Sequence, residues 1–144
     1  MIPINNNVVK KVFKKIKEYQ KIVVARHVGP DPDAIASTIA LRDSIRLTFP
    51  EKDVVAVGLG VSKFKYYGIL DKIEPEQYQG CLLIVLDVPN INRVDGIDGL
   101  AYQEIMKIDH HPAEDIKGPV DWTDETSCST CQMIAELILK TPLK

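Results

Sequence analysis

The chain of 144 residues lacks a long apolar run, an excess of charge of one sign and a full set of paired cysteines. No stretch approaches the roughly 20 apolar residues of a membrane-spanning helix, and no signal-peptide core follows its polar start, so we expect a cytosolic protein with no membrane partner. Eighteen Lys and Arg residues against twenty Asp and Glu residues give a net charge of −2, which excludes a global positive field for duplex nucleic acid. An anionic substrate must therefore be bound locally, by a few cations or by metal ions.

Cysteine is scarce in this sequence. Cys81, Cys128 and Cys131 occur in a chain large enough to bury its own core, and three thiols do not make a disulfide scaffold. We therefore expect reduced thiols. Cys128 and Cys131 form a C-x-x-C pair, but no second pair completes a zinc site, so packing at the start of a helix explains the pair better.

The composition that is present, 45% hydrophobic and 26% charged, is typical of one globular domain with its own core. Short strand-like runs alternate with segments of helical periodicity. We expect strands over Lys21–Arg26, Asp53–Val57, Cys81–Leu86 and Glu104–Ile108, and helices from Asn5–Asn7 to Tyr19, from Asp33 to Leu47, over Ser62–Leu70 and from Ser129 onward. This alternation predicts an α/β domain with a mostly parallel open sheet and helices on both faces, which binds ligands beyond the carboxyl ends of its strands.

Two of the expected helices carry further signals. The first has five lysines, which we interpret as a solvated face opposite an apolar stripe: Lys10, Lys11, Lys14, Lys15 and Lys17. In the last helix, Ser129 and Gln132 match a capping box, and Pro142 ends the helix.

The most informative polar residues follow three of the expected strands. They are His27, Asp31 and Asp33 after the first strand, Asp87 after the most apolar strand, and Asp109, His110 and His111 after the strand that ends at Ile108. A single His or Asp after a strand is commonly a turn residue or a helix cap. Three such groups at one edge of a sheet are harder to explain in that way, and they indicate a shared site.

A metal centre is the simplest explanation for these groups. Carboxylates that crowd at one place repel one another unless a cation neutralises them. Carboxylate oxygens with imidazole nitrogens suit Mn²⁺, Fe²⁺ or Co²⁺, with Mg²⁺ as an alternative, and the lack of thiolates among them argues against structural zinc. Five or more candidate ligands are better used by two ions bridged by an aspartate than by one ion.

The sequence resembles the DHH phosphoesterase superfamily in three motifs, which occur in the same order and at similar spacing. These motifs are His27-x-x-x-Asp31-x-Asp33, then Asp87 after an apolar strand, and then Asp109-His110-His111. The surrounding residues look most like the branch of small bacterial enzymes that act as oligoribonucleases and as phosphatases on 3′-phosphoadenosine 5′-phosphate. The resemblance implies that residues 1–144 are the amino-terminal, metal-binding domain of such an enzyme. It implies hydrolysis of phosphomonoesters or phosphodiesters of short nucleotides, single-stranded oligonucleotides among them, by a hydroxide that two divalent ions activate.

The resemblance also implies roles for individual residues. His27 and Asp31 would hold one ion, Asp33 and His110 the other, and Asp87 would bridge them; the ions would be Mn²⁺, with Mg²⁺ or Co²⁺ as alternatives. Asp109 would orient the histidines, His111 would face the substrate phosphate, and Arg93 would contact that phosphate or be an ordinary solvated arginine. Ser127, Ser129 and Thr130 would be helix caps or, alternatively, hydrogen-bond donors to the site.

Two parts of the family pattern do not occur before Lys144. They are a fourth aspartate and a smaller carboxyl-terminal substrate domain, and Asp121 and Asp124 lie too close to His111 to supply that aspartate. We therefore expect a truncated chain whose activity alone is in doubt. Hydrolysis of cyclic dinucleotides, polyphosphate or pyrophosphate is an alternative, and a non-catalytic nucleotide- or phosphate-binding module is an alternative of another class.

Overall fold

The computed structural model describes residues 6–27, 32–58, 68, 70–88, 94, 96–110 and 120–144. Its helices are α1 (Asn6–Glu18), α2 (Pro32–Thr48), the 3-10 helix η2 (Pro75–Tyr78) and α3 (Thr130–Lys140). Its strands are β1 (Lys21–Arg26), β2 (Asp53–Ala56), β3 (Leu82–Leu86), β4 (Glu104–Asp109) and β5 (Asp121–Thr123). Most of the helix expected over 62–70 lies outside the described residues, and the two described members, Gly68 and Leu70, are not helical.

The five strands form one sheet in the order β2-β1-β3-β4-β5, and every neighbouring pair is parallel. The α/β class and the mostly parallel open sheet are therefore confirmed. The β5 strand is new relative to the expectation from sequence, because three residues with one apolar member, Trp122, give no strand periodicity.

The route of the chain through the sheet follows from the handedness of its crossovers. Parallel strands are joined by crossovers that are nearly always right-handed. Helix α2 joins β1 to the edge strand β2, and the connection after β2 runs back in the opposite direction, past β1, to β3. Two right-handed crossovers that run in opposite directions along a sheet must lie on opposite faces of it. Helices α2 and η2 therefore cover opposite faces. The reversal makes β1 and β3 the switch point, which is where open α/β sheets bind ligands.

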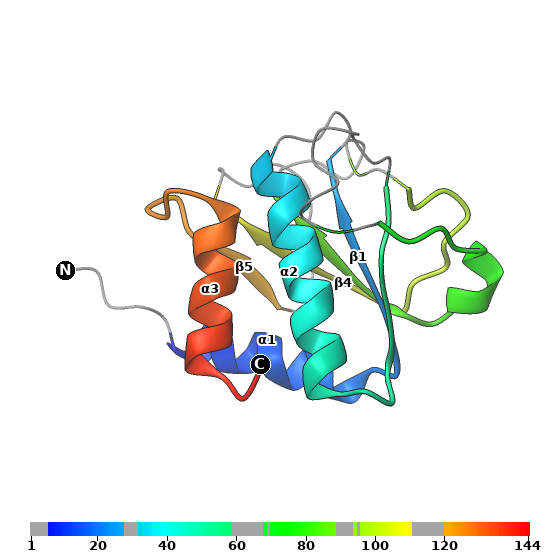
Figure 1. The fold of residues 1–144 in the computed structure, drawn as a ribbon, viewed down its shortest axis with the longest axis horizontal. Coiled ribbons are helices and arrows are strands. Elements are labelled where there is room, and N and C mark those ends of the chain that lie inside the picture. The colour runs from blue at the N-terminus through cyan, green and yellow to red at the C-terminus, as the bar shows by residue number, and fades with distance from the viewer. Residues whose placement is uncertain are drawn as a thin grey trace.

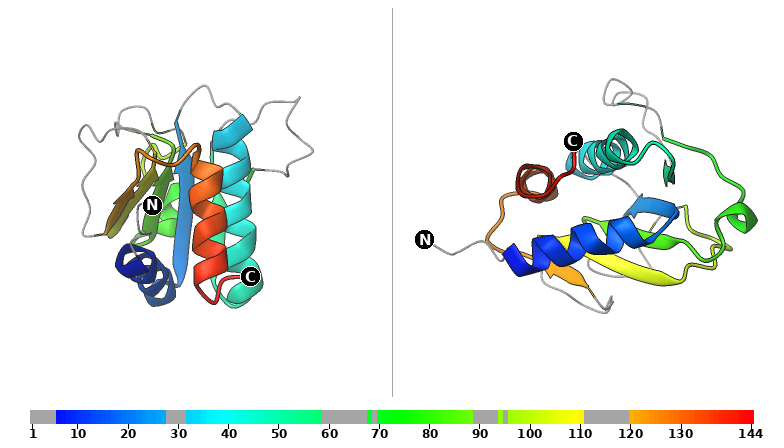
Figure 2. Two further views of the ribbon diagram at one scale, coloured as in Figure 1. Left: turned by 90° about the vertical axis from the view of Figure 1, so that its left-hand side faces the viewer. Right: turned by 90° about the horizontal axis from the view of Figure 1, so that it is seen from below.

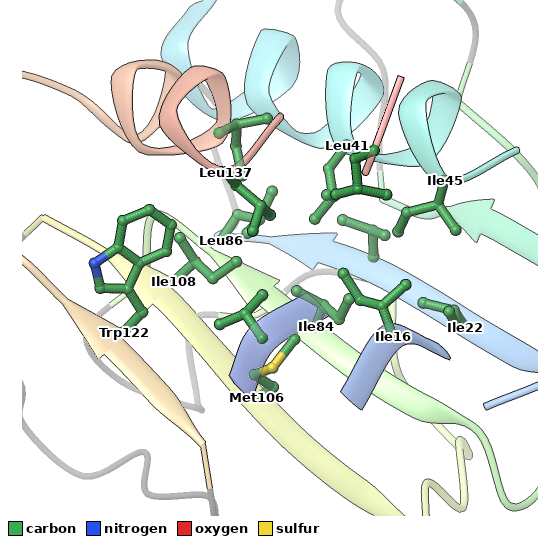
Figure 3. Packing of buried hydrophobic residues seen from close by; sticks show 14 of the residues in the cluster. Ile16, Ile22, Leu41, Ile45, Ile84, Leu86, Met106, Ile108, Trp122 and Leu137 are labelled. Atoms are coloured by element: carbon green, nitrogen blue, oxygen red, sulfur yellow. The ribbon is translucent and has the colours of Figure 1, made fainter. Parts of the chain in front are cut away.

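The described α-helices share one hydrophobic cluster with one face of the sheet (Figure 3). Figures 1 and 2 show α2 and α3 side by side against this face and α1 across the amino ends of the strands. Side chains from all three helices meet alternate strand residues, namely Ile16, Leu41, Ile45 and Leu137 against Ile22, Ile84, Leu86 and Ile108. None of the described helices is long and apolar enough to cross a membrane.

The opposite face of the sheet is covered differently. Within the described residues, its cluster combines Val23, Leu83 and Val85 of the strands with Tyr78 of η2 and Leu100. Among the residues that the structure describes, the helical cover on this side is the short 3-10 helix, and loop residues supplement it. Burial of strand residues on both faces explains why the β3 sequence is apolar without alternation.

Helix α1 is amphipathic, as its sequence predicts. Val12 and Ile16 are fully buried, whereas the lysines at 10, 11, 14 and 17 are exposed and form the expected solvated face. Lys15 turns instead toward β4 and pairs with Glu104 at 3.0 Å. The Tyr19 hydroxyl and then Lys15 lower the pKa of Glu104 by hydrogen bonding to its carboxylate. These contacts fix α1 to the start of β4.

Helix α3 begins at the capping box that the sequence predicts. Ser129 Oγ accepts from the backbone N–H of Gln132 at 3.1 Å, and Gln132 Oε1 accepts from the backbone N–H of Cys128 at 2.9 Å. Gln132 therefore reaches back one residue beyond the cap itself. All three cysteines are free thiols, in agreement with the expectation.

Replacement of Ser129 by alanine is expected to destabilise the protein by about 1 kcal/mol, because one N–H of the first turn loses its acceptor. The free energy of unfolding in urea, measured without metal, tests this value. Cys128→Ala is the matched control: its side chain is exposed and its backbone N–H keeps its partner, so we expect a change within about 0.5 kcal/mol. Equal stability of Ser129→Ala and wild type would show that the cap contributes nothing.

Candidate metal centre

Three neighbouring strands deliver the candidate site residues to one edge of the sheet. Arg26 of β1, Leu86 of β3 and Ile108 of β4 lie in one row across the sheet. His27 and Asp87 directly follow this row, and His110 comes two residues after it, just past the end of β4 at Asp109. The amino ends of α2 and α3 reach the same edge (Figure 1), and Asp33 lies in the first turn of α2. Strand order and register thus gather groups that are up to 83 positions apart in the sequence.

Asp33, Asp87 and His110 form a cluster in which one ligand atom from each lies within 4.8 Å of the others. His110 Nε2 is 3.3 Å from Asp87 Oδ1 and 3.9 Å from Asp33 Oδ2. His27 Nε2 lies on the other side of Asp87, 3.6 Å from its Oδ2 atom. Each carboxylate oxygen of Asp87 therefore faces a different imidazole.

Asp87 is the central member of this arrangement. Its side chain is 3% exposed, and its backbone N–H donates to the carbonyl of Ile108 at 3.1 Å, which ties it to β4. Its φ is 59°, in the left-handed region that Asn and Asp occupy more readily than most residues. The chain turns sharply at this point, as soon as β3 ends.

Asp33 lies between the amino ends of two helices. It belongs to the first turn of α2, and its carboxylate accepts from the backbone N–H groups of Thr130 at 3.1 Å and Cys131 at 2.9 Å, in the first turn of α3. Both helix ends carry partial positive charge, which favours the negative charge of Asp33. The Thr130 hydroxyl donates to Asp87 Oδ1 at 3.2 Å, so one turn of α3 contacts both carboxylates.

Three other acidic residues near this edge, Asp109, Asp121 and Asp124, lie outside the cluster of Asp33, Asp87 and His110. Asp109 is the last residue of β4, is fully buried, and accepts through its carbonyl from the backbone N–H of Asp124 at 3.0 Å. Asp121 accepts from the backbone N–H of Lys107. The carboxylate of Asp124 accepts a hydrogen bond from the Thr126 hydroxyl, and this bond is the main reason why the pKa of Asp124 is lowered. Neither Asp121 nor Asp124 belongs to the cluster that the described residues form.

Three of the expected site residues, Asp31, Arg93 and His111, lie outside the described residues. The roles that the sequence suggests for them stay predictions. The sequence left open whether Ser127, Ser129 and Thr130 are helix caps or hydrogen-bond donors to the site. Thr130 is a donor to the site, because it donates to Asp33 and Asp87. Ser129 is a helix cap, and Ser127 donates to Asp124.

The donor set fits a divalent cation. Around an octahedral ion with ligands at about 2.1 Å, neighbouring ligand atoms lie about 3 Å apart, which is close to the spacing between His110 and Asp87. Two carboxylates within the cluster create a need for positive charge. Oxygen and imidazole ligands without thiolate suit the harder ions, from Mg²⁺ to Mn²⁺ and Co²⁺, better than a structural zinc.

Comparison with known families agrees with this geometry. The model of the DHH family, N-terminal domain, matches residues 21–144, which include all of the strands and both helices at the site. The chain belongs to the DHH family.

Curated relatives refine the placement within the family. The chain is 40% identical over 129 residues to the bifunctional oligoribonuclease and PAP phosphatase NrnA of Bacillus subtilis, which covers 90% of this chain and 41% of the relative. It is 35% identical over 135 residues to the probable bifunctional oligoribonuclease and PAP phosphatase NrnA of Streptococcus mutans, covering 94% and 44%. The chain thus spans less than half the length of these relatives.

A solved structure shares the fold. An exopolyphosphatase-related protein from Bacteroides fragilis superimposes with a TM-score of 0.74 at 21% identity, over 97% of this chain and 45% of that one. This likeness supports the α/β architecture of a DHH amino-terminal domain.

Proposed function

We propose that this chain is the metal-binding part of a nucleotide phosphoesterase that holds two divalent cations, Mn²⁺ above all. The substrates we propose are short oligoribonucleotides and 3′-phosphoadenosine 5′-phosphate. One observation carries the proposal: the two oxygens of the buried Asp87 carboxylate face two different imidazoles, His27 and His110. A carboxylate in this position can bridge two ions.

The described residues suggest a division of ligands between the two ions. Asp33 Oδ2, Asp87 Oδ1 and His110 would hold one ion, because these atoms face one another. His27 and Asp87 Oδ2 would hold the other, together with Asp31. Asp109, buried at the end of β4 directly before His110, would keep the adjacent histidine in place.

The protein groups account for binding and charge, whereas the ions account for activation. When bound, a pair of divalent ions neutralises phosphoryl oxygens and brings the pKa of water close to neutrality. The described ligands follow strand ends or lie in the first turn of a helix, which favours a rigid site. No side chain of the described cluster is a strong nucleophile, which favours direct attack by solvent over a covalent intermediate.

The relatives support the substrate class. Two relatives, one named a bifunctional oligoribonuclease and PAP phosphatase and the other a probable one, match this chain over 90% and 94% of its length. Residues 1–144 would then be one domain of a longer enzyme, and we propose that Arg93 and His111 contact the scissile phosphate within it.

Turnover in Mn²⁺ by the longer enzyme of which we propose this chain is one domain tests this proposal. We expect this enzyme to shorten a labelled trinucleotide RNA and to release phosphate from 3′-phosphoadenosine 5′-phosphate, and we expect EDTA to abolish both reactions. Calorimetry under the same conditions is expected to detect two Mn²⁺ ions per chain. Two bound ions with no turnover of either substrate would favour the non-catalytic nucleotide-binding module, and no bound ion would contradict the proposal entirely.

A further inference from the structure

The first turn of α3 joins the two carboxylates of the candidate metal centre. Thr130 donates twice, through its backbone N–H to Asp33 Oδ2 at 3.1 Å and through its hydroxyl to Asp87 Oδ1 at 3.2 Å. Cys131 adds a backbone N–H to Asp33 Oδ1 at 2.9 Å. These partners lie 43 to 98 positions away in the sequence, so the contacts exist only in the folded protein.

The hydroxyl of Thr130 does something that the backbone of α3 does not. The two N–H groups at the start of a helix need an acceptor in any case, and Asp33 supplies it as a cap. The hydroxyl is not part of that requirement. It is fully buried and is directed at the one oxygen of Asp87 that also faces His110.

The effect of this hydrogen bond on Asp87 follows from its geometry. Each carboxylate oxygen offers about two lone-pair directions. The hydroxyl occupies one direction on Oδ1 and leaves the other for an ion beside His110, 3.3 Å away. Holding Oδ1 in this way also fixes the rotation of the carboxylate plane, and therefore keeps Oδ2 toward His27.

We infer that Thr130 is a positioning residue, whose hydroxyl orients Asp87 so that each of its oxygens serves one of the two metal ions. This inference rests on the proposed two-ion function and adds to it a residue outside the ligand set. Partners that orient metal ligands typically change metal affinity by 10- to 100-fold when they are removed.

The test compares two substitutions at position 130. Thr130→Val keeps the shape of the side chain and removes the hydroxyl, whereas Thr130→Ser keeps the hydroxyl. We expect Thr130→Val to weaken Mn²⁺ binding by about 10- to 100-fold, measured by calorimetry on the full chain. We expect Thr130→Ser to bind within about 3-fold of wild type, because its hydroxyl can still donate to Asp87.

Thr38→Val is a matched control for the loss of a buried threonine hydroxyl. Thr38 is also fully buried, but its hydroxyl donates to the carbonyl of Ala34 within α2 at 2.7 Å. We expect its metal affinity to equal that of wild type. Circular dichroism and thermal unfolding without metal establish that each variant is folded, and Thr130→Ala takes the place of Thr130→Val if the latter fails this check.

The outcomes separate the two proposals. A folded Thr130→Val or Thr130→Ala variant with wild-type metal affinity overturns the role of Thr130 and leaves the two-ion site intact. Equal losses in Thr130→Val and Thr38→Val also overturn it, because they indicate a general loss of packing. A wild-type chain that binds no divalent ion overturns both the proposed function and this inference.

Discussion

Replacement of Asp87 by asparagine is expected to prevent binding of the ion pair and to lower phosphoester turnover by about 10³-fold or more. An amide is neutral and offers one oxygen, so it cannot bridge two cations. The charge stabilisation that metal ions supply to a phosphoryl transition state is worth several kcal/mol, and each 1.36 kcal/mol is tenfold in rate. Asparagine is the right replacement because it tolerates the φ of 59° at this position, whereas alanine would add backbone strain.

Metal-free stability distinguishes loss of a ligand from loss of the fold. Asp87→Asn removes one of two crowded carboxylates and retains an oxygen that can accept from Thr130, so we expect the free energy of unfolding without metal to stay within about 1 kcal/mol of wild type. Asp98→Asn makes the same chemical change at an exposed position outside the site and is expected to leave metal binding and turnover unchanged. Wild-type ion stoichiometry in Asp87→Asn would contradict the bridging role.

The sheet was largely predictable from sequence because its two most buried strands, β1 and β3, are continuous apolar runs. β1 and β3 are buried on both faces, and their continuous runs of branched apolar residues identify them directly. β5 was not predictable, since it gains its place from pairing with β4 and from the packing of Trp122 in the core. Such contacts between distant segments cannot be predicted from the local sequence of β5.

The candidate site, too, was predictable from the sequence only in part. Its histidines and aspartates stand at strand ends, and parallel strands bring such positions to one edge, so their convergence follows from the sequence pattern. The pairing of Asp33 with the first turn of α3 does not, because 97 positions separate Asp33 from Thr130. The sequence shows two ordinary helix starts, and only packing reveals that a carboxylate of one caps the other.

This shared cap links the metal centre to the helical layer. Asp33 is at once a candidate ligand and the acceptor for two N–H groups of α3. Both of its oxygens are engaged by α3, with Oδ2 also directed toward His110. Asp33 is therefore suited to bind an ion through one oxygen, and its position is set by two helices that pack side by side.

The second large effect is expected from the histidines taken one at a time. His27→Ala and His110→Ala are each expected to reduce the Mn²⁺ stoichiometry from two to one and to lower turnover by about 10³-fold, because each histidine faces a different oxygen of Asp87. The pairing of His27 with Val94 is made by the backbone, so His27→Ala retains it. Calorimetry with Mn²⁺ measures the stoichiometry, and circular dichroism without metal verifies the fold.

Adding Asp33→Asn to each of these variants assigns the ion that remains. Asp33 lies 3.9 Å from His110 and belongs to the same ligand cluster. In His27→Ala, Asp33 should therefore help to hold the remaining ion beside His110. The double variant His27→Ala with Asp33→Asn should then bind no ion. In His110→Ala the remaining ion lies beside His27, so Asp33→Asn should change its affinity little. Asparagine keeps one acceptor for the first turn of α3, which limits the loss of stability. Equal effects of Asp33→Asn in both backgrounds would mean that the two histidines share one ion, and the two-ion assignment would be wrong.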